Sequence, residues 1–182
     1  GASYAGLKAC AIGDFAAISF FPSKNLGGFG DGGMVTCLDA GHAARLRALR
    51  MHGETSRYHH QFVGGNFRLD ALQAAVLHVK LPHLDSWAAA RRSNAAEIEA
   101  LYLEMGGRPF EDGGLSFPRV KVNGDHVFNQ FVSRVGKGRR EELKSFLAER
   151  QIGHAVYYPV PLHLQECFAY LGHRAGDFPE SE

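Results

Sequence analysis

The chain has 182 residues, of which 45% are hydrophobic and 21% charged, a composition typical of a globular protein rather than of a long disordered tail. Its net charge of +1 lacks the basic excess of a nucleic-acid-binding protein. No run approaches the roughly 18 apolar residues that cross a bilayer, and no signal peptide is visible. We therefore expect neither nucleic acid nor membrane as a partner. The three cysteines, Cys10, Cys37 and Cys167, are odd in number and far apart, which favours a reducing, cytoplasmic compartment.

The first part of the chain alternates short apolar runs with helical patterns. Residues 16–21 form an apolar run that ends at Pro22 and predicts a strand, and residues 34–38 predict a second strand. Asp39 is a candidate N-cap for a helix over 40–51. The remaining predictions in this part are a loop over 54–66, a helix from about 69 to Pro82, and a second helix over 84–105.

A Gly/Pro-rich stretch over 106–125 marks a candidate domain boundary. The segments after it predict a strand over 127–135, a helix over 139–151 and a strand over 155–158. This order indicates an α/β unit over 1–105 and an α+β unit over 106–182.

Lys24 is the strongest candidate for a catalytic residue. It follows the first predicted strand and enters a glycine cluster over 27–33. A lysine nucleophile needs a depressed pKa, which desolvation can supply, and nearby hydroxyls and glycine N–H groups can hold a phosphate. The alternative is an ordinary exposed lysine beside turn-forming glycines. The GxGxxG spacing within this cluster does not indicate a dinucleotide site, because a strand and not a helix is predicted after it.

Two further segments are candidate binding sites. Asn66 and Arg68 stand just before a predicted helix, where backbone donors face outward, although Asn66 could equally be a structural cap of that helix. Tyr158 and His163 lie on a proline-stiffened segment that could also be a packed loop. The ten histidines include no HExxH and accompany no CxxC, so we expect no metal site.

Five ordered motifs together resemble the DegT/DnrJ/EryC1/StrS family of sugar aminotransferases, which use pyridoxal 5′-phosphate (PLP). The motifs are 19–26 (SFFPSKNL), 30–33 (GDGG), 49–53 (LRMHG), 65–70 (GNFRLD) with 72–75 (LQAA), and 158–165 (YPVPLHLQ). The resemblance extends over nearly the whole sequence.

The resemblance implies the fold of fold-type I PLP-dependent transferases, which is α/β and similar to aspartate aminotransferase. Residues 1–105 would form the C-terminal part of the PLP-binding large domain and its linking helix, and residues 106–182 an incomplete small C-terminal domain. Family chains are much longer. Their first half carries the aromatic residue that stacks on the PLP ring and the acid that pairs with the pyridine nitrogen. We therefore expect these 182 residues alone to bind PLP weakly or not at all.

The resemblance also assigns roles to individual residues. Lys24 would form the Schiff base with PLP, and Ser19 would bind the cofactor phosphate. Asn66 would reach the phosphate of the neighbouring subunit's cofactor, because family active sites lie at a homodimer interface. Residues near the substrate would be Arg68, Tyr158 and His163.

The implied activity is transfer of an amino group from glutamate or glutamine to a nucleotide-linked keto sugar, in cell-surface polysaccharide or amino-sugar biosynthesis. Family dehydratases carry a histidine where this chain has Lys24, so the lysine favours transamination. Two alternatives stay open: a non-catalytic remnant that acts as a binding or association module, and a Gly-rich binding module unrelated to PLP.

Overall fold

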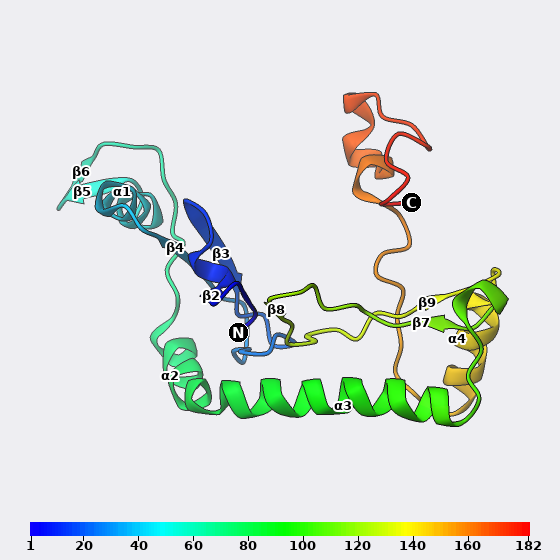
Figure 1. The fold of residues 1–182 in the computed structure, drawn as a ribbon. Helices are drawn as coiled ribbons and strands as arrows, with labels where there is room; N and C mark the ends of the chain where they lie inside the picture. The colour runs from blue at the N-terminus through cyan, green and yellow to red at the C-terminus, as the bar shows by residue number, and fades with distance from the viewer. The chain divides into compact units, whose positions relative to one another are not determined.

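The computed structural model describes residues 1–182 and is a mixture of helices and short strands (Figure 1). The chain divides into two compact units. The first comprises Gly1–Gly107 with Phe117–Phe131, and the second comprises Arg108–Ser116 with Val132–Glu182. The sequence predicts one domain boundary, after residue 105. In the structure the chain crosses back to the first unit after that boundary, because Phe117 is buried there. The assignment of these units to a large and a small domain stays a prediction.

The strands of the first unit form three small antiparallel sheets. β3 (Phe15–Ser19) pairs along its whole length with β4 (Gly33–Cys37), close to the two predicted strands. The other sheets are β2 (Leu7–Lys8), β1 (Ser3–Tyr4) and β8 (Gly124–Asp125) in that order, and the pair β5 (Glu54–Ser56) and β6 (His59–His60). The last pair corrects the predicted loop over 54–66, which contains a short hairpin.

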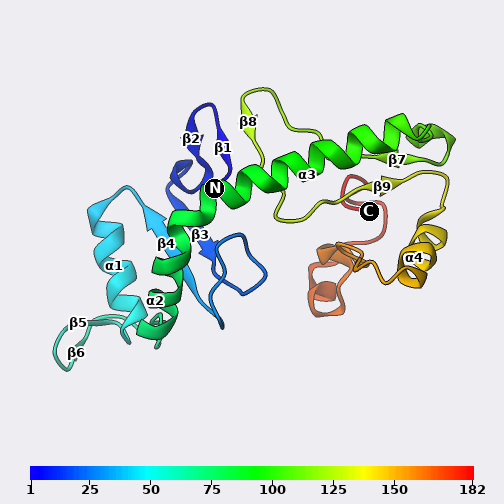
Figure 2. The ribbon, with the colours of Figure 1, turned by 90° about the horizontal axis from the view of Figure 1, so that it is seen from below.

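Helix α1 (Ala40–Arg50) begins and ends as predicted. Oδ1 of Asp39 accepts a hydrogen bond of 2.7 Å from the backbone N–H of His42, which confirms the N-cap. Gly53 follows the helix with a φ of +75°, and a Cβ there would lie 1.7 Å from the carbonyl oxygen of Phe62. Only glycine is therefore compatible with this turn. Figure 2 shows β4 on the side of α1 and β3 on the side of the β1–β2 hairpin.

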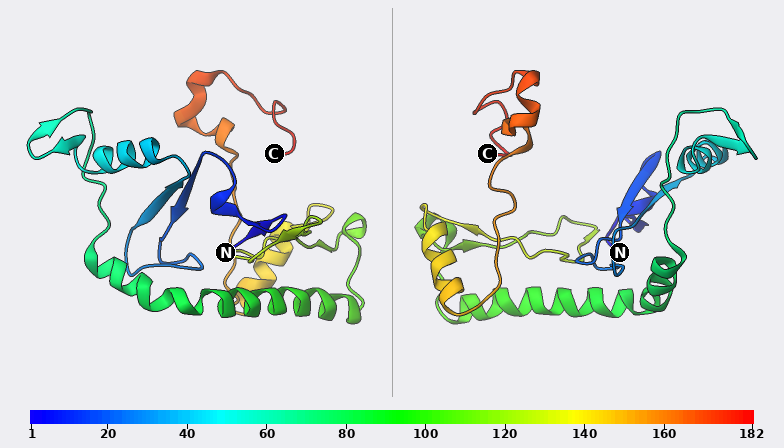
Figure 3. Two further views of the ribbon diagram at one scale, coloured as in Figure 1. Left: turned by 60° about the vertical axis from the view of Figure 1, so that its left-hand side comes forward. Right: turned by 180° about the vertical axis from the view of Figure 1, so that it is seen from behind.

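Helices α2 (Ala71–Lys80) and α3 (Leu84–Glu104) are joined by the 3-10 turn η2 (Leu81–His83), which contains Pro82 (Figure 3). Helix α2 starts after Asp70, slightly later than expected. Its Leu77 is buried, as are Ala88 and Ala95, which lie two turns apart on α3. No helix of the chain has the length and apolar character needed to span a membrane.

The second unit contains one short strand pair, one α-helix and three 3-10 turns. These are η3 (Phe110–Asp112), β7 (Leu115–Ser116), β9 (Arg134–Val135), α4 (Arg140–Glu149), η4 (Leu162–Leu164) and η5 (Glu166–Leu171). The predicted strands over 127–135 and 155–158 are wrong, apart from the two residues of β9. A strand requires a hydrogen-bonded neighbour, and β7 provides one for two residues only.

Candidate active site

The loop between β3 and β4 carries Lys24 and is closed by backbone hydrogen bonds. The N–H of Phe20 donates to the carbonyl of Gly32 at 2.8 Å, and the carbonyl of Phe20 accepts from the N–H of Gly28 at 2.8 Å. Phe20 is 7% exposed, so it anchors the start of the loop in the core. Within the loop, the N–H of Lys24 donates to the carbonyl of Phe21 at 2.9 Å, which forms a turn. The lysine thus lies on a tight loop that emerges from a strand.

Lys24 and Ser19 both line one hollow of the first unit, with a volume of about 730 Å³. Lys24 is half-buried, and the hydroxyl of Ser19 accepts a hydrogen bond of 3.3 Å from the N–H of Phe21. Lys8 and Asp85 also line the hollow, so its wall is charged in part. The volume falls within the range of small-molecule sites, about 300–1,000 Å³. The structure therefore brings together the predicted nucleophile and the predicted phosphate ligand.

Two asparagines add polar groups to the wall of this hollow. Nδ2 of Asn25 donates to the carbonyl of Val127 at 3.2 Å, which joins the Lys24 loop to a distant part of the chain. The side-chain oxygens of Asn25 and Asn129 are buried and have no hydrogen-bond partner. Both residues line the hollow. Sequence reasoning assigned no role to either, and no local signal points to Asn129.

Asn66 and Arg68 lie outside this hollow, at the end of α1. The carbonyl of Gly65 accepts from the N–H of His52 at 2.9 Å, and the N–H of Phe67 donates to the carbonyl of Arg50 at 3.1 Å. These bonds fix the backbone on both sides of Asn66, whose own side chain is exposed, as is that of Arg68. The N-cap of α2 is Asp70, so the alternative that Asn66 caps this helix is wrong.

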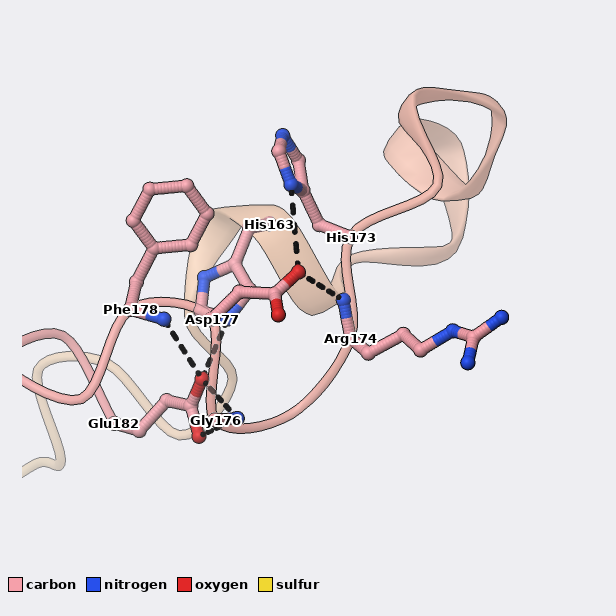
Figure 4. Close-up of polar contacts among 7 residues, drawn as sticks. All are labelled: His163, His173, Arg174, Gly176, Asp177, Phe178 and Glu182. Atoms are coloured by element: carbon pink, nitrogen blue, oxygen red, sulfur yellow. Dashed lines mark hydrogen bonds and ion pairs between the residues drawn. The ribbon is translucent and has the colours of Figure 1, made fainter.

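Tyr158 and His163 belong to the second unit. The side chain of Tyr158 is exposed and contacts the neighbouring Tyr157 ring edge-on. The side chain of His163 is only 9% exposed, and its Nε2 lies 2.8 Å from a carboxylate oxygen of Glu182 (Figure 4). The ring of Phe178 covers the imidazole at a centroid distance of 4.8 Å.

The carboxylate of Glu182 holds this C-terminal segment together. Both of its oxygens accept from the N–H of Gly176 at 2.8 Å, and one accepts from His163 (Figure 4). The N–H of Gly176 and then the imidazole of His163 lower the pKa of Glu182 from its ordinary value of 4.5, because both stabilise the ionised form. No group of three or more His, Cys, Asp or Glu side chains in the chain is placed to hold a metal ion.

Comparison with known proteins defines the class of this chain. All of its residues, 1–182, match the model of the DegT/DnrJ/EryC1/StrS aminotransferase family. The chain therefore belongs to this family, whose members are PLP-dependent sugar transaminases with the fold of fold-type I PLP enzymes.

Three relatives place the chain more closely. It is 45% identical to the pleiotropic regulatory protein of Geobacillus stearothermophilus, over 100% of this chain and 47% of the relative. It is 43% identical to the dTDP-3-amino-3,4,6-trideoxy-alpha-D-glucose transaminase of Streptomyces venezuelae, over 100% of this chain and 46% of the relative. The crystal structure of S. venezuelae DesV in complex with a ketimine intermediate matches with a TM-score of 0.87 and 42% identity, over 100% of this chain and 47% of that one. The chain thus spans about half the length of the curated relatives it matches.

The hollow presents the two groups that PLP needs here, an amine for its aldehyde and a hydrogen-bond donor for its phosphate. PLP presents an aldehyde, which an amine such as that of Lys24 can bind covalently. It also presents a phosphate, which the hydroxyl of Ser19 can bind by donating a hydrogen bond. The buried side-chain oxygens of Asn25 and Asn129 are acceptors and cannot bind the phosphate, so the fit rests on Lys24 and Ser19. The residues present therefore fit the cofactor of the family.

Proposed function

We propose that the protein that contains this chain is a PLP-dependent aminotransferase. It would move an amino group from glutamate or glutamine to a nucleotide-linked keto sugar, in the biosynthesis of amino sugars or cell-surface polysaccharides. The observation that carries this proposal is that Lys24 and Ser19 line one hollow in a chain that belongs to a family of sugar transaminases.

Lys24 has two tasks in this proposal. Its Nζ first holds the cofactor in the hollow, and after release it moves a proton at the substrate carbon as a free amine. The position of Lys24 suits both tasks, because the residue is half-buried and lines the hollow in which the cofactor would lie. When bound, PLP supplies the electron sink that stabilises the carbanion, and the protein supplies binding and orientation. Ser19 would hold the phosphate end, so that the cofactor is fixed at two points.

The remaining residues have supporting roles in a homodimer located in the cytoplasm. Asn66 would bind the phosphate of the cofactor held by the partner subunit. Its exposed side chain on a fixed backbone supports this role, since it is free to meet a second chain. Arg68, Tyr158 and His163 would lie near the substrate. The side chain of His163 is only 9% exposed and its Nε2 pairs with Glu182, so contact with substrate would require this pair to open.

The proposal is tested by adding PLP to the protein at its natural length and recording the visible absorbance band of the bound cofactor. Borohydride reduction followed by peptide mapping then identifies the modified residue. We expect the label on Lys24, and we expect Lys24→Ala to abolish it while the exposed control Lys121→Ala retains it. Label on Lys8, the other lysine of the hollow, would contradict the assignment of Lys24. Absence of both band and label in the wild-type protein would refute the function itself.

A further inference from the structure

The Lys24 loop contacts helix α2 through residues for which the proposed function has no role. The loop lies beside α2 (Figure 3), and two side chains of that helix contact it. They are Gln73 and Lys80, which lie seven residues, or about two turns, apart on one helix face. Leu77 lies between them in sequence and is 7% exposed, so this part of α2 is buried.

Gln73 lies directly against the glycine cluster that follows Lys24. Its Oε1 accepts a hydrogen bond of 2.8 Å from the N–H of Phe29. A Cβ on Gly28 would lie 2.7 Å from this oxygen, and a Cβ on Gly30 would lie 2.9 Å from Nε2. The carboxamide therefore occupies the space that side chains at these positions would need. A side chain at either position would displace the carboxamide of Gln73 from its contact with Phe29.

Lys80 forms a second contact at the other end of the same helix face. Its Nζ donates a hydrogen bond to the carbonyl of Gly27 and lies 5.9 Å from the centre of the Phe29 ring, within the range of a cation–π interaction. The side chain is half-buried, so water competes less with these contacts than at an open surface. Two side chains of α2 thus hold Gly27 and Phe29 of the loop.

These contacts fix the segment on which Lys24 lies. The loop is anchored by Phe20 at its start and by α2 from Gly27 onwards. Lys24 lies between these two anchors, so a change at the second anchor changes the position of its amine. A small displacement of a catalytic group has a large effect on the rate of a reaction.

We propose that Gln73 and Lys80 are positioning residues that hold the amine of Lys24 in the hollow. This inference rests on the proposed function, because it concerns the placement of the lysine that would bind PLP. Neither side chain needs to touch the cofactor. Each acts through the backbone of the loop.

The test uses the protein at its natural length with four variants, at Gln73, Gln61 and Lys80. Gln73→Leu preserves size and helix preference but cannot accept from Phe29, whereas Gln73→Glu retains an acceptor oxygen. Gln61→Leu is the matched control, because Gln61 is exposed. PLP affinity is measured well below the unfolding temperature, so that loss of stability alone does not change the result.

We expect Gln73→Leu to weaken PLP binding about 2- to 12-fold, which corresponds to one neutral hydrogen bond. Gln73→Glu is expected to restore most of the affinity, and Gln61→Leu to leave it unchanged. Hydrogen exchange of the Phe29 amide should be faster in Gln73→Leu before PLP is added. Lys80→Met removes the second contact and should also weaken PLP binding. This variant tests the inference even if Gln73→Leu does not fold.

Two results would overturn the inference while leaving the proposed function intact. One is normal labelling of Lys24 together with unchanged PLP affinity in both Gln73→Leu and Lys80→Met. The other is an equal loss of affinity in Gln73→Leu and Gln73→Glu, since the acceptor oxygen would then have no role. If the wild-type protein itself traps no PLP at Lys24, the proposed function fails, and this inference fails with it.

Discussion

Replacement of Gly27 by alanine provides a direct test of the geometry of the Lys24 loop. The new Cβ would lie 2.4 Å from the carbonyl oxygen of Pro22, 2.8 Å from its carbonyl carbon and 2.9 Å from the carbonyl oxygen of Phe21. All three atoms belong to the backbone, so no side-chain rotation can relieve the clash. The loop must open for alanine to fit.

The expected loss of stability has two parts. Overpacking of this kind costs about 1–3 kcal/mol. Opening of the loop also weakens the hydrogen bond that Lys80 donates to Gly27, and this weakening costs about 0.5–1.5 kcal/mol of stability. We therefore expect Gly27→Ala to lose about 1.5–4.5 kcal/mol of unfolding free energy and to bind PLP less tightly.

Gly153→Ala is the matched control for this variant. A Cβ at Gly153 has no atom within 4 Å, and its φ lies outside the positive range that disfavours alanine. We expect this substitution to stabilise the protein by about 0.4–1 kcal/mol, because alanine restricts the unfolded chain more than glycine does. Thermal unfolding and PLP titration of both variants provide the measurement. Equal unfolding midpoints for Gly27→Ala and wild type would refute the loop geometry described here.

Two further predictions concern the remaining candidate residues. Asn66→Ala should leave the unfolding midpoint unchanged, because the side chain is exposed, and should weaken PLP binding in the dimer. The exposed control Asn94→Ala should change neither the midpoint nor the PLP affinity. A lower midpoint for Asn66→Ala would instead indicate a structural role. The hydrogen bonds from Gly176 and His163 lower the pKa of Glu182, so its contribution to stability is complete above about pH 4.5 and is lost as the pH falls through the folded-state pKa. In the wild-type protein, the amides of residues 173–182 should lose protection against hydrogen exchange as the pH falls, and Glu182→Gln should remove this pH dependence. The same pH dependence in the wild-type protein and in Glu182→Gln would contradict the assignment to Glu182.

The elements that could be predicted are those specified by neighbouring residues. The Asp39 cap, the turn at Gly53 and the break at Pro82 each depend on residues within a few positions, and α1, α2 and α3 accordingly lie close to the predicted ranges. A single strand and turn also bring Lys24 and Ser19 to one hollow, while their roles there stay predictions.

The features that could not be predicted depend on residues that are distant in sequence. The run over 127–135 has the composition of a strand, yet most of it lacks a hydrogen-bonded neighbour and is irregular. Asn129 lines the same hollow as Lys24, and Gln73 accepts from Phe29, although no sequence pattern links these pairs. Patterns in a single sequence predict local conformation well, but they do not show which distant segments come into contact.

The separation between the Lys24 loop and its supports determines the order of events during synthesis. Gln73 follows Phe29 by 44 residues, and Lys80 follows Gly27 by 53 residues. At about 5–20 residues per second, the ribosome adds these helix residues about 2–11 s after the loop itself has been made. The nascent loop therefore has no final conformation until α2 has been translated and folded against it. Under the proposed function, cofactor capture by Lys24 would then be a late event, after the chain has grown well past the lysine.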